Sequence, residues 1–140
     1  MYEYRCKILR VVDGDTVDVD IDLGFGIWMH KERIRVMGID TPESRTRDLT
    51  EKAFGLAAKE YVKSLMPIGS MQIIKTQKDK TGKFGRVLGD FIIEGKLLTE
   101  LMIDNHHAVP YHGENKDAVN EAHMLNRMKL LESGLVKLED

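Results

Sequence analysis

Two aspartates lie where the sequence predicts the ends of strands, and together they could bind a metal ion. Asp15 belongs to residues 12–16, and Asp40 belongs to residues 35–43. Each has the alternation parity of apolar residues in a strand beside it, so both carboxylates continue core-facing rows, where an unpaired charge is costly. A shared cation would offset that cost, and two carboxylates with a backbone carbonyl and water suit Ca²⁺ or Mg²⁺ better than zinc. The alternative is a pair of turn aspartates that hydrogen-bond to their own backbone.

A second group of charged residues is basic and lies on a turn between two predicted strands. Its members are Lys75, Lys78, Lys80, Lys83 and Arg86, with Phe84 among them. A solvated, charged hairpin is one interpretation. The other is that this turn and the acidic residues form a phosphate site, in which a metal ion and arginines neutralise phosphoryl oxygens while a carboxylate activates water.

Three histidines near one another form a third candidate site. They are His106, His107 and His112. Histidine clusters bind transition metals, as in a His-dependent nuclease. Adjacent histidines on a strand point to opposite faces, however, and no carboxylate partner is suitably spaced. We therefore expect a surface or substrate-contact role, with the metal site as the alternative.

Hydrophobic periodicity predicts the strands and helices that must position these groups. Strands are predicted over residues 4–12, 17–23, 30–39, 70–76 and 87–93. Helices are predicted from an N-cap at Asp48 to residue 65, over residues 96–104 and over residues 117–132. In the last helix we expect four residues to face inward, namely Ala118, Ala122, Leu125 and Met128. Gly134 is expected to end that helix.

Length and composition exclude several classes of protein. A chain of 140 residues, 42% hydrophobic and 31% charged, predicts a single globular domain over residues 1–140. The net charge of −2 argues against non-specific coating of nucleic acid. One cysteine, Cys6, allows neither an internal disulfide nor a CxxC metal site, and we expect it in the core. No segment resembles a signal peptide or a membrane span, so we expect a cytoplasmic protein, with secretion after removal of a signal as the alternative.

Five short strands with helices appended predict a mainly β, α+β fold. The order of these elements favours a five-stranded OB-fold β-barrel with three α-helices over alternating βαβ units.

Three motifs, in this order, resemble those of the staphylococcal nuclease (thermonuclease) family. They are Asp-Gly-Asp-Thr at residues 13–16, Arg-x-x-x-x-Asp-Thr-Pro-Glu at residues 35–43 and Lys-Phe-Gly-Arg at residues 83–86. The resemblance covers residues 4–135. It implies an OB-fold barrel with three helices and calcium-dependent hydrolysis of phosphodiester bonds in DNA and RNA, leaving 3′-phosphates.

By position, the resemblance also implies roles for single residues. Asp15 and Asp40 match the carboxylate ligands of the metal, and Thr41 matches the carbonyl ligand. Glu43 matches the general base. The remaining matches concern the substrate: Arg35 and Arg86 for phosphate, and Lys83, Phe84 and Tyr111 for the nucleotide.

The sequence departs from the family pattern at two kinds of position. Phe84 occupies the place of a tyrosine, and a second nucleotide-contacting tyrosine has no match. Residues 23–30 form a longer hairpin, in which Phe25 and Trp28 are either a base-stacking platform or a tip packed on the barrel. We expect an altered substrate preference with the chemistry retained. The alternative is a non-catalytic OB-fold module that binds nucleic acid or protein; in either case we expect a monomer.

Overall fold

The computed structural model describes residues 2–81 and 87–138, and within them the chain forms eight strands and three helices. The strands are β1 (Tyr2–Asp13), β2 (Thr16–Gly24), β3 (Ile27–Val36), β4 (Ile39–Asp40), β5 (Met71–Thr81), β6 (Val87–Ile93), β7 (Lys96–Leu97) and β8 (Val109–Pro110). The helices are α1 (Leu49–Leu65), α2 (Leu98–Asp104) and α3 (Lys116–Ser133).

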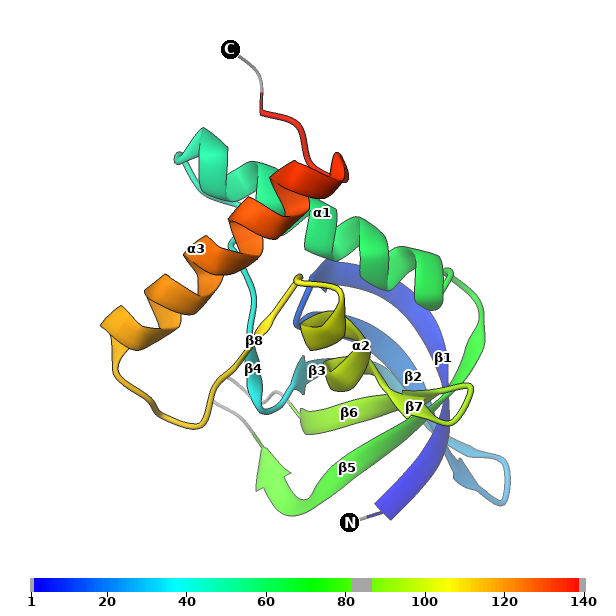
Figure 1. Cartoon of the computed structure of the whole chain (residues 1–140). Coiled ribbons are helices and arrows are strands. Elements are labelled where there is room, and N and C mark those ends of the chain that lie inside the picture. Colours follow the sequence, from blue (N-terminus) through cyan, green and yellow to red (C-terminus); the bar gives the residue numbers. More distant parts are fainter. Residues whose placement is uncertain (1, 82–86, 139–140) are drawn as a thin grey trace.

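The five long strands close into a barrel (Figure 1). Neighbours in the order β3-β2-β1-β5-β6 pair antiparallel. The ring is then closed by parallel pairing of β3 with β6, from Ile34 opposite Val87 to Val36 opposite Gly89. This arrangement, with its three helices, confirms the predicted mainly β, α+β fold class. The short strands β4 and β8 pair with each other outside the barrel.

The barrel interior is formed by the apolar faces predicted from alternation. Val17, Val19 and Ile21 of β2 are buried, as are Ile34 and Val36 of β3. Cys6 is also in this core, and burial raises the pKa of its thiol to about 12, which makes the thiol unreactive. The helices α1 and α2 add further buried side chains to the same core: Ala58, Val62, Leu98 and Met102.

Helix α1 begins as its sequence predicts. The Asp48 carboxylate accepts hydrogen bonds from the backbone N–H groups of Thr50 (3.0 Å) and Glu51 (3.2 Å), which is N-capping. The reciprocal part of a capping box is made by another residue, because the Asp48 N–H donates to Thr46 Oγ1 at 3.2 Å. The helix start is therefore fixed immediately after the loop that carries Glu43.

Helix α3 faces the protein with a different side from the one predicted. Of the four residues predicted to face inward, Ala118, Leu125 and Met128 are exposed, the last two at 60% and 58%, and Ala122 is half-buried. Val119 and Leu130 are buried instead. The prediction was wrong because polar side chains on the Val119–Leu130 side form hydrogen bonds in and beside the β4–β8 pair. The periodicity of apolar residues carries no signal for such contacts. Gly134 does end the helix, with a left-handed φ of 78°.

Several predicted boundaries also differ. Strand β5 continues to Thr81, so Lys75, Lys78 and Lys80 lie in this strand and not in the predicted turn. The third strand ends at Val36 because Gly38 makes a left-handed turn (φ 83°) before β4, and residues 96–97 form β7 ahead of α2.

The tip of the β2–β3 hairpin projects from the barrel in Figure 1, and the Phe25 side chain is fully exposed. The packed-tip interpretation is therefore wrong for Phe25. Within the described part of the chain, no helix has the length and apolar character needed to cross a membrane.

Candidate functional site

The turn between β1 and β2 places Asp15 at one end of the barrel. A Cβ on Gly14 would lie 3.0 Å from the Ala58 side chain and 3.3 Å from that of Thr41, so glycine lets this turn lie against α1. The Val36 N–H donates to the Asp15 carbonyl at 2.8 Å, which ties the turn to β3. The Asp15 side chain is thereby held at the end of β3.

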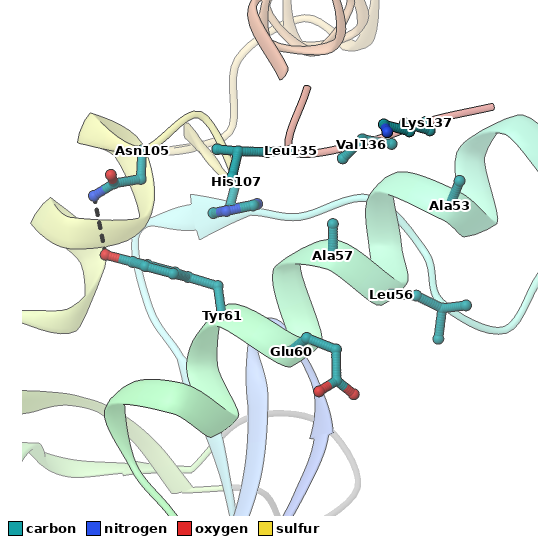
Figure 2. Close-up of a pocket in the computed structure, with 10 residues that line it drawn as sticks. All are labelled: Ala53, Leu56, Ala57, Glu60, Tyr61, Asn105, His107, Leu135, Val136 and Lys137. Carbon is teal, nitrogen blue, oxygen red and sulfur yellow. Dashed lines mark hydrogen bonds between the residues drawn. The ribbon is translucent and has the colours of Figure 1, made fainter. Parts of the chain in front are cut away.

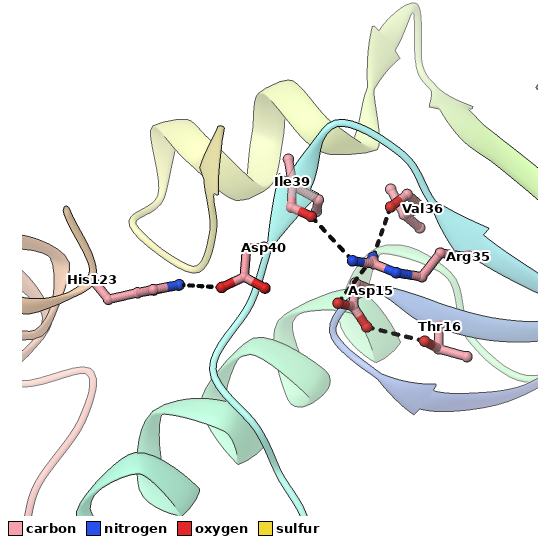
Figure 3. Close-up of polar contacts among 7 residues, drawn as sticks. All are labelled: Asp15, Thr16, Arg35, Val36, Ile39, Asp40 and His123. Carbon is pink, nitrogen blue, oxygen red and sulfur yellow. Dashed lines mark hydrogen bonds and ion pairs between the residues drawn. The ribbon is translucent and has the colours of Figure 1, made fainter. Parts of the chain in front are cut away.

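Arg35 links that turn to the chain leading to β4 (Figure 3). Its Nη1 lies 2.9 Å from Asp15 Oδ2 and donates to the Val36 carbonyl at 2.8 Å. Its Nη2 donates to the Ile39 carbonyl at 3.3 Å. One guanidinium therefore fixes the positions of the Asp15 carboxylate and of the backbone next to Asp40.

The Asp15 carboxylate retains a cost of burial despite these partners. Burial raises its pKa above the ordinary value, and this outweighs the lowering effects of the Arg35 charge and of hydrogen bonds from Thr16 and Thr41. Thr41 itself is buried. The site therefore holds a carboxylate whose negative charge is only partly compensated.

Asp40 is held from two sides. In the β4–β8 pair it lies opposite Val109, and the Tyr111 N–H donates to the Gly38 carbonyl at 2.9 Å. Its Oδ2 lies 2.7 Å from Nε2 of His123, on α3 (Figure 3). The same view shows the other oxygen of Asp40 on the side that faces Asp15.

Glu43 lies in the loop between β4 and α1, next to these aspartates. Partial burial raises its pKa, and the negative charges of Asp15 and Asp13 raise it further. The following residue, Ser44, is buried and donates a hydrogen bond from its hydroxyl to Asp13 Oδ1. Gly55 of α1 touches the same loop, because an added Cβ would lie 2.2 Å from the Glu43 carbonyl oxygen. The loop is thus fixed by β1 on one side and by α1 on the other.

The donor atoms of this cluster suit a hard cation. Asp15 and Asp40 offer carboxylate oxygens, and Thr41 offers a carbonyl, the ligand types that Ca²⁺ and Mg²⁺ bind. In the ranges 2–81 and 87–138, no three His, Cys, Asp or Glu side chains are grouped closely enough to hold a metal by themselves. A cation here would need main-chain and water ligands, which fits Ca²⁺ or Mg²⁺ better than a structural zinc site.

The structure therefore brings together five residues of the predicted site: Asp15, Arg35, Asp40, Thr41 and Glu43. Tyr111 follows β8, and its side chain is 42% exposed. The predictions for Lys83, Phe84 and Arg86 lie outside the described residues.

The three histidines are separated by their surroundings. His107 is buried and stacks on Tyr61, with ring centroids 4.8 Å apart, and burial lowers its pKa to about 4. Figure 2 shows both rings in the wall of a cavity of about 670 Å³ between α1, the end of α2 and residues 135–137, where Asn105 donates to the Tyr61 hydroxyl at 2.9 Å. His112 is exposed. Because the His107 ring is used in packing, this arrangement disfavours the His-metal alternative.

Sequence reasoning missed His123, Ser44 and Gly55. The signal for His123 was its helical spacing, because it lies four residues after Val119 and seven before Leu130, on the same side of α3. Ser44 and Gly55 gave no local signal, because each acts on a segment that only the folded chain brings near.

Comparison with known proteins gives the family. A sequence model described as "Staphylococcal nuclease homologue" matches residues 33–130, which include the segment from Arg35 to Glu43 and the stretch of α3 that carries His123. Asp15 precedes the matched residues.

The chain is also similar to individual proteins of bacteria. It is 30% identical over 96 residues to an uncharacterized protein of Bacillus anthracis (69% of this chain, 42% of the relative). It is 28% identical over 94 residues to endonuclease YncB of Bacillus subtilis (67% and 42%). It is 30% identical over 98 residues to a thermonuclease of Staphylococcus intermedius (66% and 54%). The alignments span about half the length of these relatives; by the family match, the chain belongs to the staphylococcal nuclease homologue family.

Proposed function

We propose that the chain is a calcium-dependent nuclease that hydrolyses phosphodiester bonds of DNA and RNA. The observation that carries the proposal is the grouping of Asp15, Arg35, Asp40 and Glu43 at one end of the barrel. Membership of a family with nuclease-named relatives supports the reaction class. The donor types of Asp15, Asp40 and Thr41 support Ca²⁺.

Arg35 is suited to bind a phosphate group. A guanidinium has five N–H donors, and three contacts of Arg35 are made by Nη1 and Nη2. These three contacts use both N–H groups of Nη1 and one of Nη2, so they leave Nε–H and the second Nη2–H for a ligand. Two N–H groups are what a bidentate contact with phosphate requires, and the three internal contacts hold the guanidinium plane in place.

Glu43 is suited to accept a proton from the attacking water. Partial burial and the neighbouring carboxylates raise its pKa, which makes the carboxylate a better base than an ordinary glutamate. Ca²⁺, when bound by Asp15, Asp40 and the Thr41 carbonyl, would supply electrostatic stabilisation of the charge on the phosphoryl oxygens. The larger share of the acceleration comes from such charge stabilisation, because general-base assistance contributes only about 10²–10⁴-fold.

Digestion of plasmid DNA, single-stranded DNA and RNA tests the proposal. Parallel reactions contain Ca²⁺, Mg²⁺ or EGTA, with Glu43→Gln as the variant and Glu3→Gln, at an exposed position of β1, as the charge-matched control. We expect cleavage that requires Ca²⁺, a loss of about 10²–10⁴-fold in turnover for Glu43→Gln, and no loss for the control. Labelled oligonucleotides would show whether the 3′ ends carry phosphate.

Binding of nucleic acid without cleavage in any metal would overturn the proposal in favour of a binding module. Near-normal turnover of Glu43→Gln would leave a nuclease but remove the assigned base.

A further inference from the structure

Helix α3 contacts the β4–β8 region with polar side chains. His123 Nε2 lies 2.7 Å from Asp40 Oδ2, and Asn126 Nδ2 donates to the Ala108 carbonyl at 3.2 Å. The His123 side chain is only 13% exposed. Val119 and Leu130, nearer the two ends of the helix, supply the buried apolar contacts. The histidine is therefore held next to Asp40 by a docked helix.

The bond has a defined direction. An ionised carboxylate only accepts hydrogen bonds, so the proton between the two groups belongs to His123 Nε2. A separation of 2.7 Å is within the range of charge-assisted bonds. His123 thereby occupies Oδ2 of Asp40, while the other oxygen faces Asp15 (Figure 3).

Asp40 depends on this partner because its own strand gives little support. Strand β4 has two residues, and the Asp40 side chain is 39% exposed. An exposed carboxylate on a two-residue strand can rotate, and each rotation away from the productive orientation adds an entropic cost to ligand binding. A hydrogen bond to one oxygen removes most of this freedom.

We propose that His123 is a positioning residue, which fixes the Asp40 carboxylate so that its free oxygen serves as a calcium ligand. This inference rests on the proposed function. It assigns to α3 a direct part in the site, although the helix lies far along the chain from Asp40. Partners that orient a ligating side chain in this way change metal affinity by about 10–100-fold when they are removed.

Calcium affinity of the full chain, measured by isothermal titration, tests the proposal without relying on cleavage. His123→Leu removes the donor and keeps an apolar side chain of similar reach, whereas His123→Gln returns an N–H near the position of Nε2. Asn126→Leu is the matched control, because it deletes the other polar contact of the same helix face. We expect about 10–100-fold weaker binding for His123→Leu, substantial recovery for His123→Gln and unchanged affinity for Asn126→Leu.

Equal weakening in His123→Leu and Asn126→Leu would show that helix docking alone matters, and would overturn the positioning role. Unchanged affinity in His123→Leu, in a wild-type chain that binds Ca²⁺, would overturn it as well while leaving the nuclease proposal intact. A wild-type chain that binds no Ca²⁺ would instead remove the proposed calcium dependence, and this role with it.

Discussion

Arg35 is the residue in which structural contacts and the proposed binding of phosphate meet in one guanidinium. Its contacts with Asp15 and with the carbonyls of Val36 and Ile39 use N–H groups on two nitrogens. A lysine ammonium has three donors at a single point and lacks the planar fork, so it cannot make these contacts and also grip a phosphate. Residue identity, and not charge alone, therefore matters at this position.

Substitution of Arg35 by lysine is expected to reduce turnover by about 10²–10³-fold, because a fixed donor to the phosphoryl oxygens is lost. The free energy of unfolding is expected to fall by about 1–3 kcal/mol, because partly buried acceptors lose their donors. Arg33→Lys is the control, since Arg33 lies on the same strand and pairs with Asp18 at an exposed position. Kinetics at a temperature where all variants are folded, together with urea unfolding, measure the two effects; equal turnover in both variants would contradict the assignment.

At the scale of elements, the contact between α1 and the Glu43 loop is the most demanding. An added Cβ on Gly55 would lie 2.2 Å from the Glu43 carbonyl oxygen and 2.6 Å from the Ser44 nitrogen. Backbone atoms cannot yield as a flexible side chain can. The Glu43 loop can therefore lie this close to α1 only because residue 55 is a glycine, and this close approach sets the position of the proposed base.

Gly55→Ala separates helix propensity from this close approach. Propensity alone predicts a gain of about 1 kcal/mol in the free energy of unfolding, because alanine is the better helix former. The close contact predicts the opposite sign, together with a fall in turnover as the Glu43 loop is displaced. Thermal unfolding and turnover of Gly55→Ala, beside Thr50→Ala at an exposed position of α1, would decide; stabilisation with full activity would show that the loop moves freely.

The sequence was a good guide to elements and a poor guide to contacts between them. Alternation in β2 and the cap at Asp48 are local signals, so these elements could be predicted together with the Asp15–Glu43 cluster. The orientation of α3 could not, because His123 and Asn126 are stabilised inward by partners elsewhere in the chain. Burial of apolar side chains and hydrogen bonding of polar side chains compete to decide which helix face is turned inward. Only the burial of apolar side chains produces a periodic pattern in the sequence.

At the scale of the whole molecule, we expect His107 to make the free energy of unfolding depend on pH below about 6.5. Burial lowers its pKa from 6.5 to about 4, so the unfolded chain takes up a proton in this interval before the folded chain does. The free energy of unfolding therefore falls as the pH drops from about 6.5 towards 4, by up to roughly 3 kcal/mol. Asp15 and Glu43, whose pKa values are raised, contribute with the opposite sign: their share is lost as the pH rises through the raised values.

His107→Phe is expected to flatten the profile between pH 6.5 and 4 while keeping a ring stacked on Tyr61. The variant also removes Nδ1, a buried atom without a hydrogen-bond partner among the described residues. Urea unfolding across this range, with the exposed His112→Gln as control, measures the change. A profile as steep as that of the wild type would mean that His107 is not the group responsible.

The closure of the barrel also bears on how the protein folds. The pairing of β3 with β6 joins segments far apart in the sequence, and Arg35 stands in its middle, opposite Leu88. Contacts between distant segments require the most loop-closure entropy, and folds that depend on them assemble slowly, in milliseconds to seconds. Two residues after Arg35, the Met37 N–H donates to the Gly89 carbonyl at 3.0 Å, so the chain that leads to Asp40 is fixed against β6 only when the ends of the sheet meet. A chain that has collapsed around its apolar strands but has not joined β3 to β6 holds the core without yet holding the site.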